Sequence, residues 1–208
     1  YFCATVGWVS NPVAKKLFEA AGIDWATTVS AARQPSFKGM PMNLKLSTTL
    51  SVKSKYDKTY NVIGKITGTK QPDEYIIYST HWDHLGIGKA DEKGDTIYNG
   101  ALDNASGTAG MLEIAKAFKS MKVKPNRTLI FLAVTAEEQG LWGSEYYAQN
   151  PIYPREKTVA NINIDGINPY GKMKDIVVVG IGQSELEDYL NEEAKAVGRY
   201  TSPEPNPV

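Results

Sequence analysis

The spacing of apolar positions along this chain changes several times, and these changes predict where its helices and strands lie. Residues 13–21 carry apolar side chains at helical spacing, with Pro12 at the first helical position and Gly22 at the end. Residues 23–42 contain turn-forming residues and predict a loop. Residues 43–56 alternate apolar and polar positions, which predicts a strand or one arm of a hairpin.

From Tyr60 onward, short apolar runs alternate with segments of helical spacing. This order is typical of an α/β fold with a mixed, mostly parallel central sheet and helices on both faces. The tail at residues 201–208 contains three prolines and predicts a loop. The expected strands are residues 61–67, 74–80, 128–134, 159–164 and 175–179, and the expected helices are residues 106–121, 143–149 and one that follows a Ser184–Glu187 capping box.

The amino-acid composition argues against several classes of binding partner and metal site. The 208 residues include 23 Lys+Arg and 23 Asp+Glu, so no global field favours nucleic acid or an anionic membrane surface. Cys3 is the single cysteine, which excludes internal disulfides and a cysteine-rich zinc site. No apolar run is long enough for a membrane span.

Chemically active side chains follow the predicted strands at the points where these strands end. His81 and Asp83 come directly after one strand, Glu137-Glu138 after the most apolar strand, and Asp165 after a third. In open α/β sheets, ligands bind beyond the carboxyl ends of the strands, so these groups are expected to share a cleft. Asp103 lies in the turn that opens the helix at residue 106 and is expected to join them.

Each of these residues also has a structural interpretation. Asp103 is a typical helix cap, although Ser106 is available for capping in its place. Glu137-Glu138 resembles solvated surface charge, but adjacent carboxylates after an apolar strand are costly unless they share a cation or a proton. We interpret His84 as structural, with only one histidine of the pair directed into the cleft. Asp83 is expected to orient the imidazole of His81.

Taken together, one imidazole and several carboxylates favour a metal site over these separate interpretations. The ligand types suit Zn²⁺, with Mn²⁺ or Co²⁺ as alternatives. One carboxylate can bridge two metal ions, and two-metal sites are used by hydrolytic enzymes, aminopeptidases among them. One glutamate of the Glu137-Glu138 pair has to stay uncoordinated if it is to move protons.

Four ordered motifs resemble the co-catalytic dizinc aminopeptidase family, which includes aminopeptidase Y, bacterial leucyl aminopeptidases and glutamate carboxypeptidase II. They are Thr-His-Trp-Asp-His (80–84), Gly-Ala-Leu-Asp-Asn-Ala-Ser-Gly (100–107), Thr-Ala-Glu-Glu-Gln-Gly-Leu-Trp-Gly-Ser (135–144) and Asn-Ile-Asp-Gly (163–166).

The resemblance implies a zinc exopeptidase fold and a role for each matching residue. His81 would bind one zinc ion and Asp83 would orient it. Asp103 would bridge both ions, with a cis peptide bond after it, and Asp165 would complete the first site. Glu138 would bind the second ion. Glu137 would be the general base that takes a proton from the activated water and passes it to the leaving amine.

The resemblance also suggests how the chain is organised. Residues 1–55 are expected to be an N-terminal segment, in which Gly7-Trp8-Val9-Ser10 and the helix after it resemble the end of a protease-associated domain. Residues 56–208 are expected to be a catalytic domain that is truncated at its C-terminus. The family takes a further histidine for the second zinc from a later Ser-Asp-His segment, and no histidine follows His84 here. We therefore expect one complete zinc site, part of a second, and weak activity of this segment alone.

The function implied by the resemblance is removal of the N-terminal residue from a peptide substrate, in an extracytoplasmic location. A carboxypeptidase or dipeptidase of the same family is an alternative, although the motifs show no clustered pair of basic residues to hold a terminal carboxylate. A glutaminyl cyclase on the same scaffold would retain fewer metal ions. A non-catalytic receptor-type domain is the alternative from another functional class, and such domains usually lose metal ligands by substitution.

Overall fold

The chain forms two compact units, Tyr1–Tyr56 and Asp57–Val208. The computed structural model describes residues 6–205. The division falls next to the expected boundary between residues 55 and 56. The assignment of the first segment to a protease-associated domain stays a prediction.

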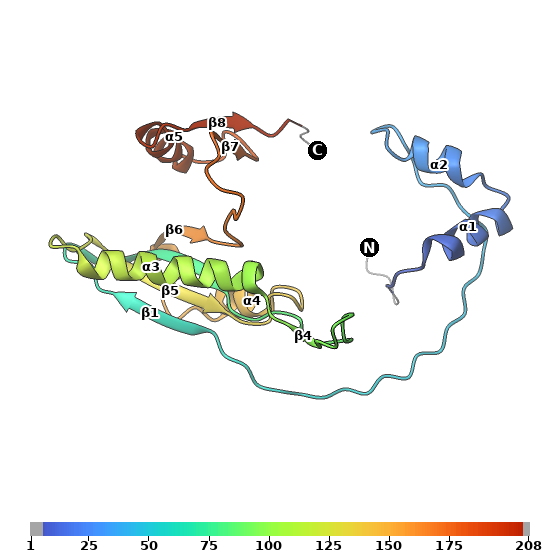
Figure 1. Ribbon diagram of the computed structural model, residues 1–208, viewed down its shortest axis with the longest axis horizontal. Coiled ribbons are helices and arrows are strands. Elements are labelled where there is room, and N and C mark those ends of the chain that lie inside the picture. The colour runs from blue at the N-terminus through green and yellow to red at the C-terminus, as the bar shows by residue number, and fades with distance from the viewer. Residues whose placement is uncertain (1–5, 206–208) are drawn as a thin grey trace. The chain divides into compact units, whose positions relative to one another are not determined.

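The N-terminal unit contains two short helices, α1 (Asn11–Ala20) and α2 (Trp25–Ala31) (Figure 1). They meet through an edge-to-face contact between Phe18 and Trp25, whose ring centroids are 4.9 Å apart. The prediction of a loop over residues 23–42 missed α2. Its sequence signal is Asp24, whose carboxylate accepts a hydrogen bond from the Thr27 backbone N–H at 2.7 Å.

The prediction of a strand at residues 43–56 was also wrong, because this segment has no regular secondary structure. Its alternating apolar side chains, including Leu46 and Val52, are exposed to solvent. Alternation describes how a strand would divide its side chains between two faces. A strand also needs a partner for its backbone N–H and C=O groups, and none of the described sheets includes these residues.

The second unit is built on a four-stranded sheet whose order is β1-β5-β2-β6. Strands β2, β5 and β6 are parallel to one another, and β1 is antiparallel to β5. The mixed, mostly parallel sheet predicted from the sequence is thus confirmed. The strands are β1 (Val62–Ile66), β2 (Gln71–His81), β5 (Arg127–Val134) and β6 (Thr158–Asn163).

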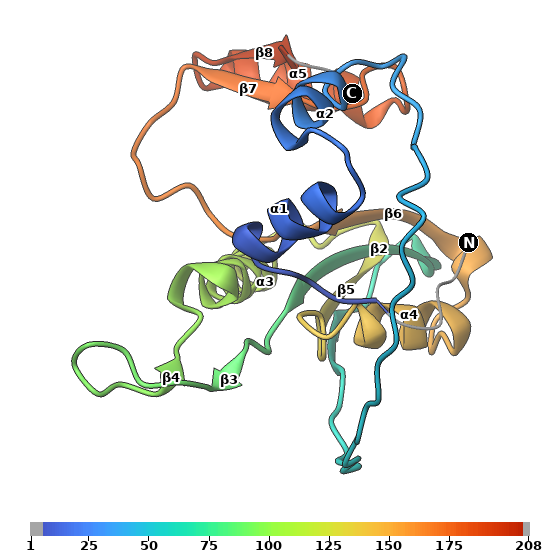
Figure 2. The ribbon, with the colours of Figure 1, turned by 90° about the vertical axis from the view of Figure 1, so that its right-hand side faces the viewer.

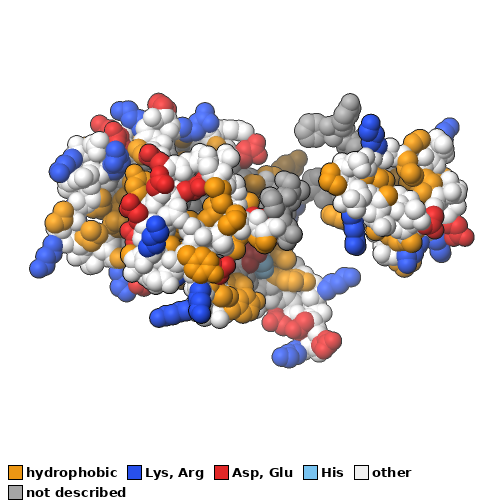
Figure 3. All heavy atoms as spheres, turned by 90° about the horizontal axis from the view of Figure 1, so that it is seen from above, with side chains coloured by type: hydrophobic (Ala, Val, Ile, Leu, Met, Phe, Trp, Pro, Cys, Tyr) orange, Lys and Arg blue, Asp and Glu red, His pale blue; other side chains and the backbone are white. Residues whose placement is uncertain are grey.

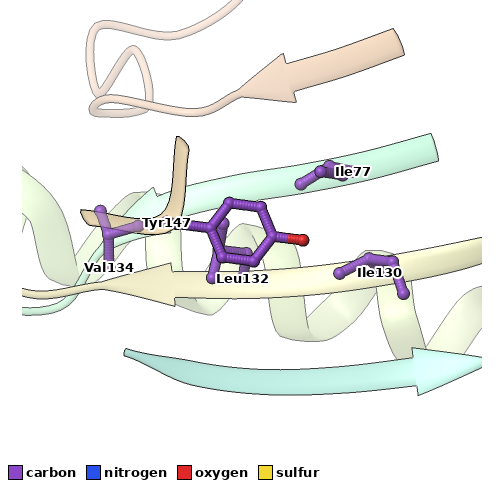
Figure 4. Packing of buried hydrophobic residues seen from close by; sticks show 5 residues of the cluster. All are labelled: Ile77, Ile130, Leu132, Val134 and Tyr147. Carbon is purple, nitrogen blue, oxygen red and sulfur yellow. The ribbon is translucent and has the colours of Figure 1, made fainter. Parts of the chain in front are cut away.

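Helices α3 (Gly107–Ser120) and α4 (Trp142–Gln149) cover opposite faces of this sheet. Consecutive side chains of β5 point to opposite faces, so this one strand supplies both cores. Tyr147 of α4 packs on one face (Figure 4), and Met111 of α3 packs on the other. The first core consists of Ile77, Ile130, Leu132, Val134 and Tyr147, and the second of Met111, Leu129, Phe131 and Ala133.

The remaining elements include a hairpin and a second parallel pair of strands. Strands β3 (Gly86–Ile87) and β4 (Ile97–Tyr98) form an antiparallel hairpin between β2 and α3 (Figure 2). The expected strand at 175–179 is present as β7 (Asp175–Val178), which pairs with β8 (Tyr200–Pro203). The first part of the tail at 201–208 is therefore a strand rather than the expected loop, and residues 206–208 lie outside the described range. The short 3-10 helix η2 (Arg155–Lys157) precedes β6.

Helix α5 (Leu186–Ala196) follows the predicted capping motif, but the capping contacts differ from those expected. Glu187 accepts hydrogen bonds from the backbone N–H groups of Gly182 and Gln183, and Ser184 accepts one from Leu186. The two side chains therefore stabilise the turn before the helix instead of bonding reciprocally.

The surface of the described residues agrees with the balanced composition. Basic and acidic side chains are intermixed on the face shown in Figure 3, without a broad field of either sign. None of the described helices combines the length and apolar character needed to cross a bilayer.

Candidate metal centre

The parallel strands bring the predicted residues to one edge of the sheet. His81 is the last residue of β2 and pairs with Val134, the last residue of β5. The chain continues from β5 into Glu137-Glu138, and from β6 through Ile164 into Asp165. The Ile164 N–H donates to the Ser79 carbonyl of β2 at 2.9 Å, which keeps the end of β6 beside β2. Because these strands run in the same direction, their carboxyl ends and the side chains beyond them meet.

His81, Asp103 and Asp165 form the first donor group. The Nε2 atom of His81 lies 3.0 Å from Oδ1 of Asp103 and 3.2 Å from Oδ1 of Asp165. Two ligand atoms at zinc bond lengths of about 2.0–2.1 Å in a tetrahedral site are about 3.3 Å apart. Both His81 distances are close to this value, and all three donor atoms lie within 4.8 Å of one another, so the group is compatible with one zinc ion. The His81 side chain is 3% exposed, whereas Asp103 and Asp165 are 60% and 56% exposed.

The ring of His81 is fixed from the side opposite to these carboxylates. Its Nδ1 atom lies 3.0 Å from the backbone carbonyl of Asp83, whereas the nearest Asp83 carboxylate oxygen is 3.8 Å away. The sequence had suggested that the carboxylate itself would orient the ring. That carboxylate accepts the Glu137 backbone N–H at 3.1 Å instead. A proton on Nδ1, donated to the Asp83 carbonyl, leaves the Nε2 lone pair available to a metal ion.

Asp103 is presented by η1 (Ala101–Ser106), a wide π-helical turn in which Asp103 and Asn104 have non-helical backbone angles. The Asp103–Asn104 peptide bond is cis, as the family resemblance implied. Asp103 does not cap α3. Ser106 does not cap it either, because its hydroxyl donates to the Leu102 carbonyl at 2.6 Å and accepts the Ile167 N–H at 3.1 Å.

Asn104 is a structural residue of the site to which the sequence analysis gave no role. Its side chain is 2% exposed and donates from Nδ2 to the Thr80 hydroxyl and to the Ile164 carbonyl, each at 2.9 Å. Its Oδ1 accepts the N–H groups of Gly107 at 3.0 Å and Gly166 at 2.9 Å. An amide side chain has two donors and two acceptor positions, and all are used here. Asn104 thus ties the turn that carries Asp103 to the ends of β2 and β6.

A second donor group contains Glu138 and shares Asp103 with the first. Its third member is His84, whose Nδ1 lies 2.5 Å from Oε1 of Glu138. His84 therefore contacts a candidate metal ligand, a contact that its structural interpretation from the sequence did not include. No pattern along the sequence signals the contact, because His84 and Glu138 are 54 residues apart and meet only through the pairing of β2 with β5.

Glu137 lies beside both donor groups and belongs to neither of them in the described part of the chain. Its Oε2 atom is 3.9 Å from Nε2 of His81. Burial raises the pKa of the Glu137 carboxyl, and the negative charges of Asp165, Glu138 and Asp103 raise it further. The attraction of His81 acts in the opposite direction, and the net shift is upward.

The pKa of His81 is also raised, although burial alone lowers it. The hydrogen bond to the Asp83 carbonyl and the negative charges of Glu137, Asp165 and Asp103 outweigh burial. Without a cation, the carboxylates around this one imidazole therefore shift its equilibrium toward the protonated form.

A cleft of about 550 Å³ opens next to these residues. It is lined by the polar residues His81, Glu137 and Asp165 and by apolar side chains that include Leu132 and Leu141. Such a cleft, mainly apolar with a few converging polar groups, is typical of a small-ligand site.

The chain resembles known proteases in sequence. The pattern of peptidase family M28 matches residues 61–208. A probable zinc metalloprotease of Pyrenophora teres f. teres is 36% identical over 104 residues, which are 50% of this chain and 22% of that protein. The aminopeptidase NAALADL1 of Mus musculus is 37% identical over 110 residues, which are 50% of this chain and 13% of that protein.

The fold resembles solved structures as well. The zinc aminopeptidase BSAP of Bacillus subtilis is similar with a TM-score of 0.53 and 28% sequence identity, over 69% of this chain and 34% of that one. This chain thus spans about a third or less of the length of each of these relatives. The family pattern nevertheless covers well over half of the chain and includes all the donor residues described above, so the chain belongs to peptidase family M28.

Proposed function

We propose that this chain carries the metal-binding core of a zinc-dependent aminopeptidase in which Glu137 is the general base. One observation carries the proposal: two donor groups share Asp103, while the Glu137 carboxylate lies beside them and stays outside both. A purely structural metal site would not need a further partly buried carboxylate at this position.

The donor atoms present fit zinc. His81, Asp103 and Asp165 would hold one ion, and Asp103 and Glu138 would contribute to the second. When bound, zinc would supply Lewis-acid polarisation of the scissile carbonyl and lower the pKa of a water molecule.

Glu137 is placed to move protons between the reacting groups. Its carboxylate accepts a proton from the attacking water and delivers it to the nitrogen of the leaving amine. A carboxyl group whose pKa is raised is better suited to this exchange, because general acid–base catalysis is most efficient when the pKa approaches the working pH. The Glu137 N–H bond to the Asp83 carboxylate fixes the backbone from which the side chain extends.

The carboxylate oxygens that the metal ions leave free favour a substrate with a free amine, because they can accept hydrogen bonds from it. The α-amino group of a peptide is largely protonated near neutral pH, with a pKa of about 7.7–8.0, and is attracted to Asp103 and Asp165. Among the described residues that line the cleft, Arg155 is the only one with a cationic side chain. This single cation keeps a carboxypeptidase as the second candidate.

Replacing Glu137 tests the mechanism. In the full-length protein, Glu137→Gln should retain zinc content and lower kcat about 100- to 10,000-fold, because it removes the proton acceptor and leaves the donor atoms in place. Glu138→Gln is the matched control, since it should weaken zinc binding as well. Turnover by Glu137→Gln at the wild-type rate would disprove the role of Glu137.

Substrate pairs separate the two peptidase activities. Amino-acid p-nitroanilides with a free amine should be hydrolysed, and the same compounds with a blocked amine should not. Hydrolysis of N-blocked peptides from their C-terminus, lost in Arg155→Ala, would support the carboxypeptidase. Zinc binding without hydrolysis of either substrate class would support a non-catalytic domain.

A further inference from the structure

His84 lies in the metal centre without a role in the chemistry proposed above. Its side chain is 22% exposed and that of Glu138 is 17% exposed, so solvent competes little for their contact. The Nδ1 atom of His84 lies 2.5 Å from Oε1 of Glu138. His84 is therefore either a third ligand of the second metal ion or a hydrogen-bond donor to a ligand.

The distance between the two side chains distinguishes these roles. Two ligands of one tetrahedral zinc ion lie about 3.3 Å apart, given bond lengths of about 2.0–2.1 Å. The contacts of His81 in the first donor group, at 3.0 and 3.2 Å, are close to that separation. The Nδ1 atom of His84 and the Oε1 atom of Glu138 are much closer than that, so they are in direct hydrogen-bonding contact and would have to move apart to hold one ion between them.

The backbone on the other side of His84 is adapted to its ring. Gly100 has a positive φ of 62°, and a Cβ atom at this position would lie 2.8 Å from Cγ of His84 and 2.7 Å from the Asp103 carbonyl oxygen. A residue with a side chain would therefore push the imidazole away from the turn that carries Asp103. Gly100 leaves room for the ring between this turn and Glu138.

We propose that His84 is a positioning residue of the second metal site: its Nδ1–H donates to Oε1 of Glu138 and holds that carboxylate beside Asp103. This leaves the second carboxylate oxygen of Glu138 available as a ligand. A free glutamate side chain has several rotatable bonds, and fixing it before the ion arrives reduces the entropy lost on binding. The proposal rests on the metal-binding part of the proposed function and does not depend on the peptidase reaction.

The test replaces His84 by asparagine and by alanine in the full-length protein. The Nδ2 group of asparagine takes nearly the place of Nδ1 in histidine, so it can donate to Glu138, but a neutral amide is a poor zinc ligand. His84→Ala should weaken binding of the second zinc ion about 10- to 100-fold, the usual effect of losing a hydrogen-bond partner of a ligand. His84→Asn should recover most of that loss. Zinc titration of the metal-free protein by calorimetry measures both ions.

His81 supplies the matched control, because it is the only other histidine in the chain. His81→Asn removes a ligand and should abolish tight binding of the first ion, whereas the same substitution at His84 should preserve both ions. With Co²⁺ in place of zinc, the visible spectrum of His84→Asn should stay that of the wild type, since no ligand changes. Thermal unfolding of each metal-free variant shows whether it has folded.

Two results would overturn the proposal. Zinc affinity unchanged in His84→Ala would show that the hydrogen bond does not position Glu138. A loss in His84→Asn as large as in His84→Ala, with an altered Co²⁺ spectrum, would make His84 a direct ligand. Both measurements follow metal binding, so an inactive wild-type protein would disprove the peptidase proposal and leave this one standing.

Discussion

Each side chain of the metal centre combines its charge with a particular degree of burial. His81 is buried at the end of β2 and is oriented by the Asp83 carbonyl, so the imidazole has little freedom to turn. Asp103 and Asp165 are largely exposed, so water solvates their carboxylates. A fixed imidazole together with solvated carboxylates gives a cation a defined point of attachment and an open path of entry.

The raised pKa of His81 leads to a prediction about metal binding. Below that pKa the imidazole of the metal-free protein carries a proton, which zinc has to displace; above it the ring is neutral and binds directly. Zinc affinity should therefore continue to rise as the pH increases past about 6.5, which is the ordinary pKa of histidine. Zinc binding should also release protons. Calorimetry in two buffers that differ in ionisation enthalpy, from about pH 6 to about pH 8.5, measures both effects. An affinity that levels off at the ordinary histidine pKa would contradict the prediction.

Part of this residue-level arrangement was predictable. The strand-end rule brought His81, Glu137 and Asp165 together because parallel strands end at one edge, and the turn motif added Asp103. The contact of His84 with Glu138 and the four hydrogen bonds of Asn104 were not predictable in this way. These contacts form between segments that are far apart in the sequence, and the spacing of residues within a segment does not indicate them.

At the level of elements, the start of α3 lies in close contact with the strand ends. A Cβ atom on Gly107 would lie 2.1 Å from Oδ1 of Asn104 and 2.8 Å from the Ile164 carbonyl oxygen. The absence of a side chain at this position allows Asn104 to bond to both β2 and the segment after β6.

We therefore expect Gly107→Ala to destabilise the unit and to weaken zinc binding, because Asn104 must shift and η1 with it. The loss should be about 1–3 kcal/mol in the free energy of unfolding, as for other overpacked positions. Urea denaturation of the metal-free protein measures it. Gly64→Ala in β1 is the control, since no heavy atom lies within 4 Å of its added Cβ. Equal stability of the two variants would contradict the expected clash.

The elements that the sequence predicted correctly share a physical basis. Strands β2 and β5 and helix α3 bury their apolar side chains against neighbours, so periodicity and structure agree. The alternating segment at 43–56 lacks a strand partner among the described residues, and α2 has no buried residue to give it an apolar stripe. Where apolar side chains are not buried in the folded unit, their periodicity does not predict the secondary structure.

At the level of the whole second unit, the donor side chains come from four separate stretches of the chain. These stretches are the end of β2 with the residues after it, the turn η1, the segment after β5 and the segment after β6. The unfolded chain does not hold these residues together, so an ion that binds them favours the folded state.

Zinc should accordingly raise the melting temperature of the protein, and EDTA should reverse the change. At a free concentration about 100 times the Kd, bound zinc contributes about 2.7 kcal/mol to the free energy of unfolding. Asp103→Asn should remove most of this stabilisation. Asp95→Asn in the β3–β4 loop, outside both donor groups, should keep it. Differential scanning calorimetry provides the comparison, and an unchanged zinc effect in Asp103→Asn would count against the site.

Because Asp103 belongs to both donor groups, two ions that filled these groups would not be gained or lost independently. The first ion to arrive orders a carboxylate that the second also needs, which promotes uptake of the second. Mutual repulsion of two dications that share one carboxylate acts in the opposite direction. Whichever effect dominates, thermodynamic reciprocity requires each ion to change the affinity for the other by the same factor. The zinc content of the protein at limiting metal will therefore depend on this coupling as well as on the two separate affinities.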